Sequence, residues 1–133
     1  MIFLDSWIWL ELYSESEKWK KCEEIILLKD KKCISAMVLL EIKYKGTKKF
    51  GLEKTNKMIN HIEEDKDIKI IPLTKEIAKL AASLKLKYYD RIKKDLSYGD
   101  VINLATAILT NCKILYSGDS DFSNIEEIKT IIV

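Results

Sequence analysis

The stretch Lys113-Ile114-Leu115-Tyr116-Ser117-Gly118-Asp119-Ser120-Asp121-Phe122 decides the fold of this chain. Its first residues have apolar or aromatic strand character and run into a turn of small residues, a pattern typical of a buried strand. The turn then presents two acids, Asp119 and Asp121. Ligands of open α/β sheets bind just beyond the carboxyl ends of the strands. These carboxylates therefore predict a cation site, provided that other acids of the chain meet them there.

Short apolar segments alternate with helical patterns along the whole chain. We expect strands at residues 1–4, 31–34, 68–71, 113–116 and 128–133, and helices at 6–13, 15–28, 36–49, 52–65, 74–89 and 97–111. Alternation of this kind predicts βαβ units, with helices on both faces of a parallel sheet. The predicted fold class is α/β: three αβα layers around a central, mostly parallel sheet of about five short strands, in a single domain over residues 1–133.

The composition is typical of a globular protein without a membrane segment. Of the 133 residues, 47% are hydrophobic and 33% are charged, and no apolar run approaches the roughly 20 residues that span a bilayer. The N-terminus has no basic leader, and the three cysteines are widely spaced, which favours reduced thiols. We expect a cytoplasmic protein. Because the net charge is only +2, attraction to a nucleic acid would require locally segregated basic residues.

Three further acids stand where an ordinary surface acid would not. Asp5 ends the first predicted strand, Glu41 lies in a helix that is apolar on nearly every side, and Asp100 is in the first turn of the most buried helix. An ionised carboxylate away from water is costly unless it is paired or binds a metal. Structural alternatives exist: Asp5 could cap a helix, and Glu41 could pair with Lys45. Asp100 could form a capping box with Ser97.

The acids of the turn have a structural alternative too, since Asp in a turn commonly bonds its own backbone. Taken together, however, these alternatives require several independent coincidences, all at strand ends or helix starts. A pocket of four or more carboxylates with no matching Arg or His requires a hard cation. Oxygen-only ligands favour Mg²⁺ or Mn²⁺. The helical pattern also places Asn103 on the same face as Asp100, which extends the polar patch.

Four segments carry a resemblance to a known family. They are Ile2-Phe3-Leu4-Asp5-Ser6, Ser35-Ala36-Met37-Val38-Leu39-Leu40-Glu41, Leu96-Ser97-Tyr98-Gly99-Asp100-Val101-Ile102-Asn103-Leu104-Ala105-Thr106-Ala107 and Ser117-Gly118-Asp119-Ser120-Asp121-Phe122. In order, spacing and total length they resemble the PIN-domain ribonucleases, most closely the VapC-type toxins of VapBC toxin–antitoxin pairs. The resemblance covers the whole chain.

The resemblance implies a site, a reaction and partners. The implied catalytic acids are Asp5, Glu41, Asp100 and Asp119, which together with Asp121 would bind one or two Mg²⁺ or Mn²⁺ ions; the accessory residues are Asp121, Ser117, Ser6 and Asn103. The implied reaction is hydrolysis of RNA phosphodiester bonds, which needs no general-base histidine. The implied partners are RNA, a cognate antitoxin and a second copy of the chain in a homodimer.

An acidic pocket repels RNA, so basic residues must supply the attraction. The candidates for RNA contact lie in two basic stretches. They are Lys43, Lys45, Lys48 and Lys49 on the helix of Glu41, and Lys85, Lys87, Arg91, Lys93 and Lys94 before Asp100. We expect Trp9, Leu12 and Tyr13 to be exposed and to line the antitoxin groove or the homodimer interface. The bulk of Trp7 and Trp9 after Asp5 is expected to narrow or shape the site.

Other functions are compatible with parts of this pattern. A phosphohydrolase of the haloacid-dehalogenase type also begins with a strand that ends in Asp, but it needs a second acid where this chain has Trp7. A receiver-like signalling domain would need an acidic pair near Asp5. Within the PIN-like fold, an RNA-maturation nuclease and a catalytically inert binding module remain as alternatives. The intact set of acids argues against the inert module, since an unused set would only add repulsion.

Overall fold

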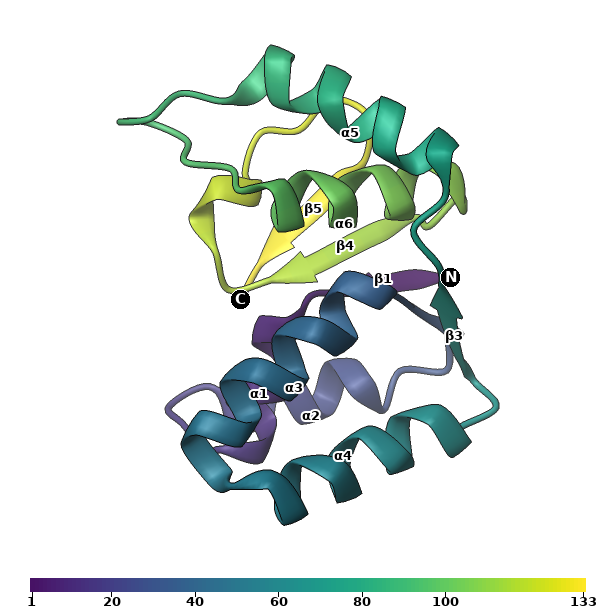
Figure 1. The fold of residues 1–133 in the computed structure, drawn as a ribbon, viewed down its shortest axis with the longest axis vertical. Helices are drawn as coiled ribbons and strands as arrows, with labels where there is room; N and C mark the ends of the chain where they lie inside the picture. The colour runs from purple at the N-terminus through teal and green to yellow at the C-terminus, as the bar shows by residue number, and fades with distance from the viewer.

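The computed structural model describes residues 1–133 and contains one sheet of five strands (Figure 1). The strands are β1 (Ile2–Leu4), β2 (Lys32–Ser35), β3 (Ile68–Ile71), β4 (Ile114–Ser117) and β5 (Lys129–Ile132), and their order in space is β3-β2-β1-β4-β5. Every neighbouring pair is parallel. The predicted α/β class is confirmed.

Helices cover both faces of this sheet. They are α1 (Ser6–Tyr13), α2 (Trp19–Ile26), α3 (Ala36–Phe50), α4 (Leu52–Glu64), α5 (Lys75–Tyr88) and α6 (Tyr98–Leu109), with a short 3₁₀ helix, η1 (Ser120–Phe122). The chain steps outward from β1 to β3 and then crosses back to β4, so right-handed connections put the first four helices on one face and the last two on the other. Figure 1 shows these layers, with α5 and α6 above the strands and α1 to α4 below them.

The core follows from this layering. Ile2, Phe3 and Leu4 of the central strand are fully buried, because helices cover β1 on both sides. Helix α6 is buried along most of its length and contributes Leu104 and Ala105 to the same core. Cys22, Cys33 and Cys112 are free and buried. None of the helices combines the length and the apolar character that a membrane span requires.

The first two helices differ from the expectation. Trp9 is only 3% exposed and belongs to the core, so the prediction that it is exposed was wrong; Leu12 and Tyr13 are half-buried. The short helix α1 is apolar on most sides, and Ile8 and Trp9 are its buried apolar residues. Helix α2 begins at Trp19 rather than at residue 15. The break comes from a turn in which Glu15 has a φ of 50°.

The strand order decides where a site can form. The connections leaving β1 and β4 run to opposite faces of the sheet, which leaves a crevice beyond the carboxyl ends of these two strands. Asp5 directly follows β1, and Asp119 comes two residues after the end of β4. The sequence patterns place both acids at strand ends, and the topology makes these two ends neighbours.

Candidate functional site

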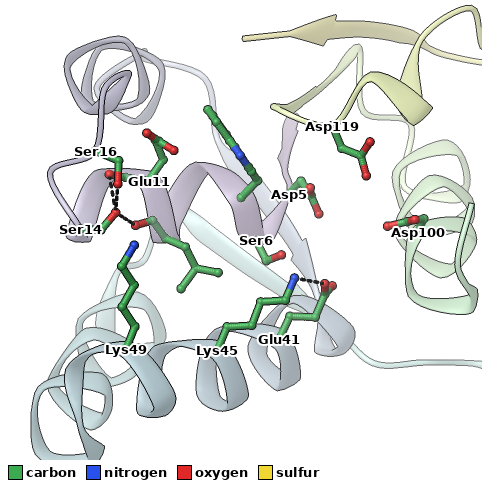
Figure 2. A pocket seen from close by; sticks show the side chains of 12 residues that line it. Asp5, Ser6, Glu11, Ser14, Ser16, Glu41, Lys45, Lys49, Asp100 and Asp119 are labelled. Carbon is green, nitrogen blue, oxygen red and sulfur yellow. Dashed lines mark hydrogen bonds and ion pairs between the residues drawn. The ribbon is translucent and has the colours of Figure 1, made fainter. Parts of the chain in front are cut away.

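A pocket of about 300 Å³ lies beyond the carboxyl ends of β1 and β4. One end is lined by Asp5, Glu41, Asp100 and Asp119, which are called the four pocket acids below. Figure 2 shows their carboxylates around a common space, with each acid coming from a different element of the chain. The other end of the pocket is lined by Glu11, Ser14, Ser16, Lys45 and Lys49.

Asp5 is the most enclosed of the four pocket acids. Only 5% of the residue is exposed. It stands at the N-cap position of α1, yet its side chain makes no capping hydrogen bond, so the capping alternative does not account for its carboxylate. Instead the hydroxyl of Ser117 donates to one carboxylate oxygen at 2.7 Å, and the side-chain amide of Asn103 donates to the other at 3.2 Å. Both donors hold the carboxylate at the pocket wall.

Asn103 connects two of the four pocket acids. Its side-chain nitrogen donates to Asp5 and also lies 3.5 Å from a carboxylate oxygen of Glu41. Its side-chain oxygen accepts a hydrogen bond from the hydroxyl of Ser35 at 2.5 Å. The same Ser35 caps α3 by accepting from the backbone N–H of Val38 at 3.2 Å. The chain thus fixes α3, α6 and β1 to one another through a single buried amide.

Glu41 pairs with Lys45 and also lines the pocket, so both interpretations of this residue, an ion pair and a site acid, agree with the structure. Its side chain is 20% exposed, and the ammonium of Lys45 lies 3.7 Å from one carboxylate oxygen, one helical turn away. The Lys45 side chain is itself 59% exposed, so the pair is screened by water and contributes little to stability. The carboxylate nevertheless points into the pocket together with those of Asp5 and Asp100.

Asp100 and Asp119 are each anchored by the local backbone. One carboxylate oxygen of Asp100 accepts the N–H of Ser97 at 2.9 Å, and the hydroxyl of Ser97 accepts the N–H of Asp100 at 3.1 Å, which completes a capping box. One oxygen of Asp119 accepts the N–H of Asp121 at 2.9 Å. The N–H of Asp119 donates to the hydroxyl of Ser117 at 3.0 Å. The capping and turn alternatives are therefore real, and each leaves one carboxylate oxygen free of these bonds.

Burial and neighbouring charges raise the pKa values of Asp5, Glu41 and Asp100. Burial raises the pKa of Asp5 from 3.8 to about 7, the hydroxyl of Ser117 opposes this, and the charges of Glu41 and Asp100 add to it. Burial is also the main cause that raises the pKa values of Glu41 and Asp100. Among the pocket's basic residues, Lys45 alone pairs with an acid, and no Arg or His lines the pocket. The site therefore carries more negative charge than its own residues neutralise.

The donor chemistry fits a hard divalent cation. All four pocket acids offer carboxylate oxygens, which Mg²⁺ and Mn²⁺ prefer. No three acids, histidines or cysteines are close enough together to hold one ion between them. The pocket thus gathers the ligand types without bringing them to a single point.

The remaining predicted site residues lie at different distances from this pocket. Ser6 lines it, and Ser117 and Asn103 form its wall through their bonds to Asp5. Asp121 does not line it. Its carboxylate lies near Asp119 and Asp95, and burial together with the charge of Asp119 raises its pKa.

Most of the basic residues proposed for RNA contact lie outside the pocket. Of these residues, Lys45 and Lys49 line it. Lys43 bonds to Asn56 on α4, and Lys87 pairs with Glu126 and Glu127 at 3.0 and 3.1 Å. Arg91 and Lys93 are exposed in the turn after α5, and Lys94 donates to the backbone of Ser123.

The sequence interpretation missed part of the lining. Ser14 was expected between two helices and Ser16 inside the second of them, so nothing in the sequence pattern pointed to either. Ser35 caps α3 through a local bond, whereas its second bond, to Asn103, depends on contact between distant segments.

A family model described as PIN domain matches residues 2–128. The chain belongs to the PIN domain family. This agrees with the fold and with the order of the four segments described above. A comparison with curated protein sequences finds no match.

Solved structures share the PIN fold of this chain. A toxin–antitoxin complex from Klebsiella pneumoniae superimposes with a TM-score of 0.73 and 24% identity, covering 100% of both chains. VapC20 from Mycobacterium tuberculosis, described as a toxin that cleaves the sarcin–ricin loop, gives a TM-score of 0.77 at 15% identity, covering 96% of this chain and 98% of the other. VapBC2 from Rickettsia felis, bound to a DNA fragment from its promoter, gives 0.74 at 17% identity, covering 99% and 98%. At these identities the likeness shows the fold alone.

Proposed function

We propose that this PIN-domain protein is an endoribonuclease that hydrolyses RNA phosphodiester bonds with Mg²⁺ or Mn²⁺ bound by the four pocket acids, and that it is the toxin of a toxin–antitoxin pair. One observation carries the proposal. Carboxylates from the end of β1, from α3, from the start of α6 and from the turn after β4 line one pocket, and of its two lysines only Lys45 pairs with one of them. Such an excess of negative charge in a partly buried pocket is expected when a cation is part of the working site.

The residues of the pocket have distinct parts in this proposal. A bound divalent ion would supply an activated water and neutralise charge that develops on the phosphate. Asp5, Glu41, Asp100 and Asp119 would hold it. Ser117 and Asn103 keep the carboxylate of Asp5 in place, so that its oxygens need not reorient when the ion binds. The capping box does the same for Asp100.

The comparisons support the partner as well as the chemistry. One solved neighbour is described as a toxin–antitoxin complex, and another as a toxin that cleaves the sarcin–ricin loop. We expect a cognate antitoxin to insert an Arg or Lys among the four pocket acids, which would neutralise them and block the substrate. Expression of the chain alone should arrest growth, and co-expression with the gene beside its own should relieve the arrest and give a complex that purifies intact.

The experiment that tests the nuclease uses a mixed pool of single-stranded and structured RNA. Wild type and Asp100→Asn are incubated with Mg²⁺, Mn²⁺ or EDTA, and binding of Mn²⁺ to each protein is measured by calorimetry. Asn keeps the size of Asp and can still accept the N–H of Ser97, so α6 should remain capped. We expect metal-dependent cleavage by wild type, and loss of both cleavage and tight Mn²⁺ binding in the variant.

A matched control separates the effect of losing a negative charge anywhere on the protein from the effect of losing one in the pocket. Glu63→Gln removes one negative charge from the exposed end of α4, outside the pocket, and should cleave like wild type. Equal cleavage by wild type and Asp100→Asn would show that the pocket acids are not the catalytic centre. A folded wild type that binds Mn²⁺ but leaves all RNA intact would favour the inert binding module.

A further inference from the structure

The pocket extends well beyond the four pocket acids. Figure 2 shows Lys49 on α3 facing Ser14 and Ser16, on the side away from Asp100 and Asp119, whereas Lys45 points to Glu41. Only two apolar residues line the pocket, Trp7 and Leu10, and both come from α1. This second half, lined by Trp7, Leu10, Glu11, Ser14, Ser16 and Lys49, is called the α1–α3 arm.

The indole of Trp7 packs against Gly118 in this arm. A Cβ atom placed on Gly118 would lie 2.1, 2.3 and 2.5 Å from the indole atoms Cε2, Cδ2 and Cζ2 of Trp7. A point this near to three adjacent ring atoms lies over the face of the ring, so the glycine covers one face of the indole. The backbone of Gly118 has no positive φ, so its conformation alone does not call for glycine. The absent side chain at position 118 is what makes room for Trp7.

Lys49 supplies a free positive charge at the far end of the arm. Glu41, Lys45 and Lys49 follow one another at intervals of four residues on α3, so Lys49 lies about 12 Å along the helix from Glu41. Lys45 is paired with Glu41, whereas Lys49 takes part in none of the salt bridges of the molecule. Its ammonium lies 5.9 Å from the ring centroid of Phe50, a weak contact at an exposed site, so it remains available to an anion that enters the pocket.

We propose that the α1–α3 arm binds the substrate strand, with the indole of Trp7 stacking on an unpaired base beside the reacting phosphate and Lys49 binding a neighbouring backbone phosphate. This inference rests on the proposed function, and it assigns Trp7 and Lys49 to the binding of an unpaired stretch of the RNA. An anionic strand with flat bases suits an aromatic face and a free ammonium. A protein segment that neutralised the acids would be basic and would gain nothing from Lys49.

The charge part of the proposal is tested with Lys49→Ala and its neighbour Lys48→Ala. Both lysines are exposed on α3, but only Lys49 lines the pocket. Binding of a fluorescent single-stranded RNA is measured by anisotropy at several salt concentrations, with Ca²⁺ in place of Mg²⁺. The plot of log K against log salt has a negative slope. Loss of one phosphate contact in Lys49→Ala should make this slope shallower by about 0.7. Lys48→Ala should keep the wild-type slope.

The stacking part is tested with Trp7→Ala and a set of RNAs in which one nucleotide at a time is abasic. Removal of an aromatic side chain that stacks on a base lowers the affinity about tenfold. We expect one abasic position, next to the cleaved bond, to weaken binding to wild type by this amount and to have little further effect in Trp7→Ala. Tyr44→Ala, which removes an exposed aromatic of α3 that does not line the pocket, should show wild-type behaviour at every position.

Gly118→Ala gives an independent test of the same contact. Its methyl group would displace the indole, so binding should fall as in Trp7→Ala. In the double variant the methyl group meets no ring, and binding should match that of Trp7→Ala alone. Thermal unfolding and circular dichroism of each variant identify any that fail to fold.

The outcomes separate this inference from the proposed function. If wild type cleaves RNA but Trp7→Ala and Lys49→Ala bind RNA like wild type, the inference is overturned and the nuclease stands. If wild type shows the expected salt slopes and abasic pattern but cleaves nothing, the strand-binding arm is supported and the nuclease fails. If Trp7→Ala loses the same affinity for intact RNA as for every abasic RNA, the role of Trp7 is structural and the stacking proposal is overturned.

Discussion

At the scale of single residues, Asp5 and Asn103 hold the most consequential positions. Both are buried, and each joins segments that are far apart in the sequence. Asp5 carries an acidic group where ionisation is costly, and Asn103 presents its amide donors to two of the four pocket acids. Changes at either position should therefore depend on pH in a defined direction.

For Asp5 the prediction concerns the stability of the metal-free protein. Its pKa is 3.8 when unfolded and about 7 in the folded chain, so between these values the folded state binds the additional proton and stability falls as the pH rises. From pH 5 to pH 8 the free energy of unfolding should fall by about 2 to 3 kcal/mol through this group. Asp5→Asn should remove most of this slope, as measured by urea denaturation in EDTA. The exposed Asp67→Asn should keep it.

Added Mg²⁺ or Mn²⁺ gives the complementary measurement. A cation that binds the ionised carboxylates stabilises the folded state by mass action, so its effect on Tm should be larger at pH 8 than at pH 5. A stability profile of the metal-free wild type that is flat or rises over this range would contradict the prediction for Asp5.

For Asn103 the prediction uses an isosteric change. Asn103→Asp replaces the donating amide with an acceptor beside the carboxylates of Asp5 and Glu41, and it leaves their buried oxygens without a partner. We expect a loss of about 2 to 4 kcal/mol in the free energy of unfolding at pH 8, and a smaller loss at pH 5, where the new acid is protonated. Denaturation at both pH values measures this. Asn60→Asp, at an exposed position of α4, serves as the control, and equal effects of the two changes would refute the proposed network.

At the scale of elements, the helix caps connect stability to the site. Ser35 and Ser97 cap α3 and α6, the two helices that carry Glu41 and Asp100. Thr74 caps α5 in the same way, by accepting the N–H of Ile77 at 3.2 Å, but α5 carries no pocket acid. The caps therefore offer a way to separate what a cap gives to the fold from what it gives to the site.

Ser97→Ala and Thr74→Ala form a matched pair of cap deletions. Each should lower the free energy of unfolding by about 1 kcal/mol, since each leaves one N–H of the first turn without its side-chain acceptor. Only Ser97→Ala should also weaken Mn²⁺ binding, because it loosens the turn that positions Asp100. Calorimetric titration with Mn²⁺ and urea denaturation measure the two effects. Equal Mn²⁺ affinities in both variants would show that the cap is structural only.

At the scale of the whole molecule, exposed apolar residues gather on the layer formed by α5 and α6. Leu86, Tyr89 and Tyr98 lie together there, and Leu86 is 88% exposed. We predict that this patch is an interaction surface. The four pocket acids lie beyond the carboxyl ends of the strands and do not line this patch, so a second copy of the chain could cover it without closing the pocket.

The homodimer predicted from the sequence is therefore expected to form through the α5 and α6 layer. Leu86→Glu places a charge in the centre of the patch and should convert a dimer to a monomer in sedimentation velocity experiments, because burying an unpaired charge is costly. Leu40→Glu adds the same charge at an exposed leucine of α3, on the opposite layer, and should leave the dimer intact. A wild type that sediments as a monomer at high concentration would contradict this expectation.

The sequence by itself determined the local features of this protein. The apolar runs of β1 and β4, the cap at Ser35 and the capping box at Ser97 depend on neighbouring residues, and all are present. The positions of the acids at strand ends and helix starts follow from the same short-range patterns. These features were enough to predict an α/β fold and to select Asp5, Glu41, Asp100 and Asp119 as candidates.

Only the tertiary structure decided which of these residues meet. The strand order makes the ends of β1 and β4 neighbours, and this brings Asp119 but not Asp121 into the pocket. The same packing leaves most of the basic residues predicted to bind RNA outside the pocket. The indole of Trp7 lies on Gly118, more than a hundred residues along the chain, and Asn103 lies between carboxylates of two other segments. Contacts between such distant segments leave no periodic pattern in the sequence, because they are set by how whole layers pack rather than by local spacing.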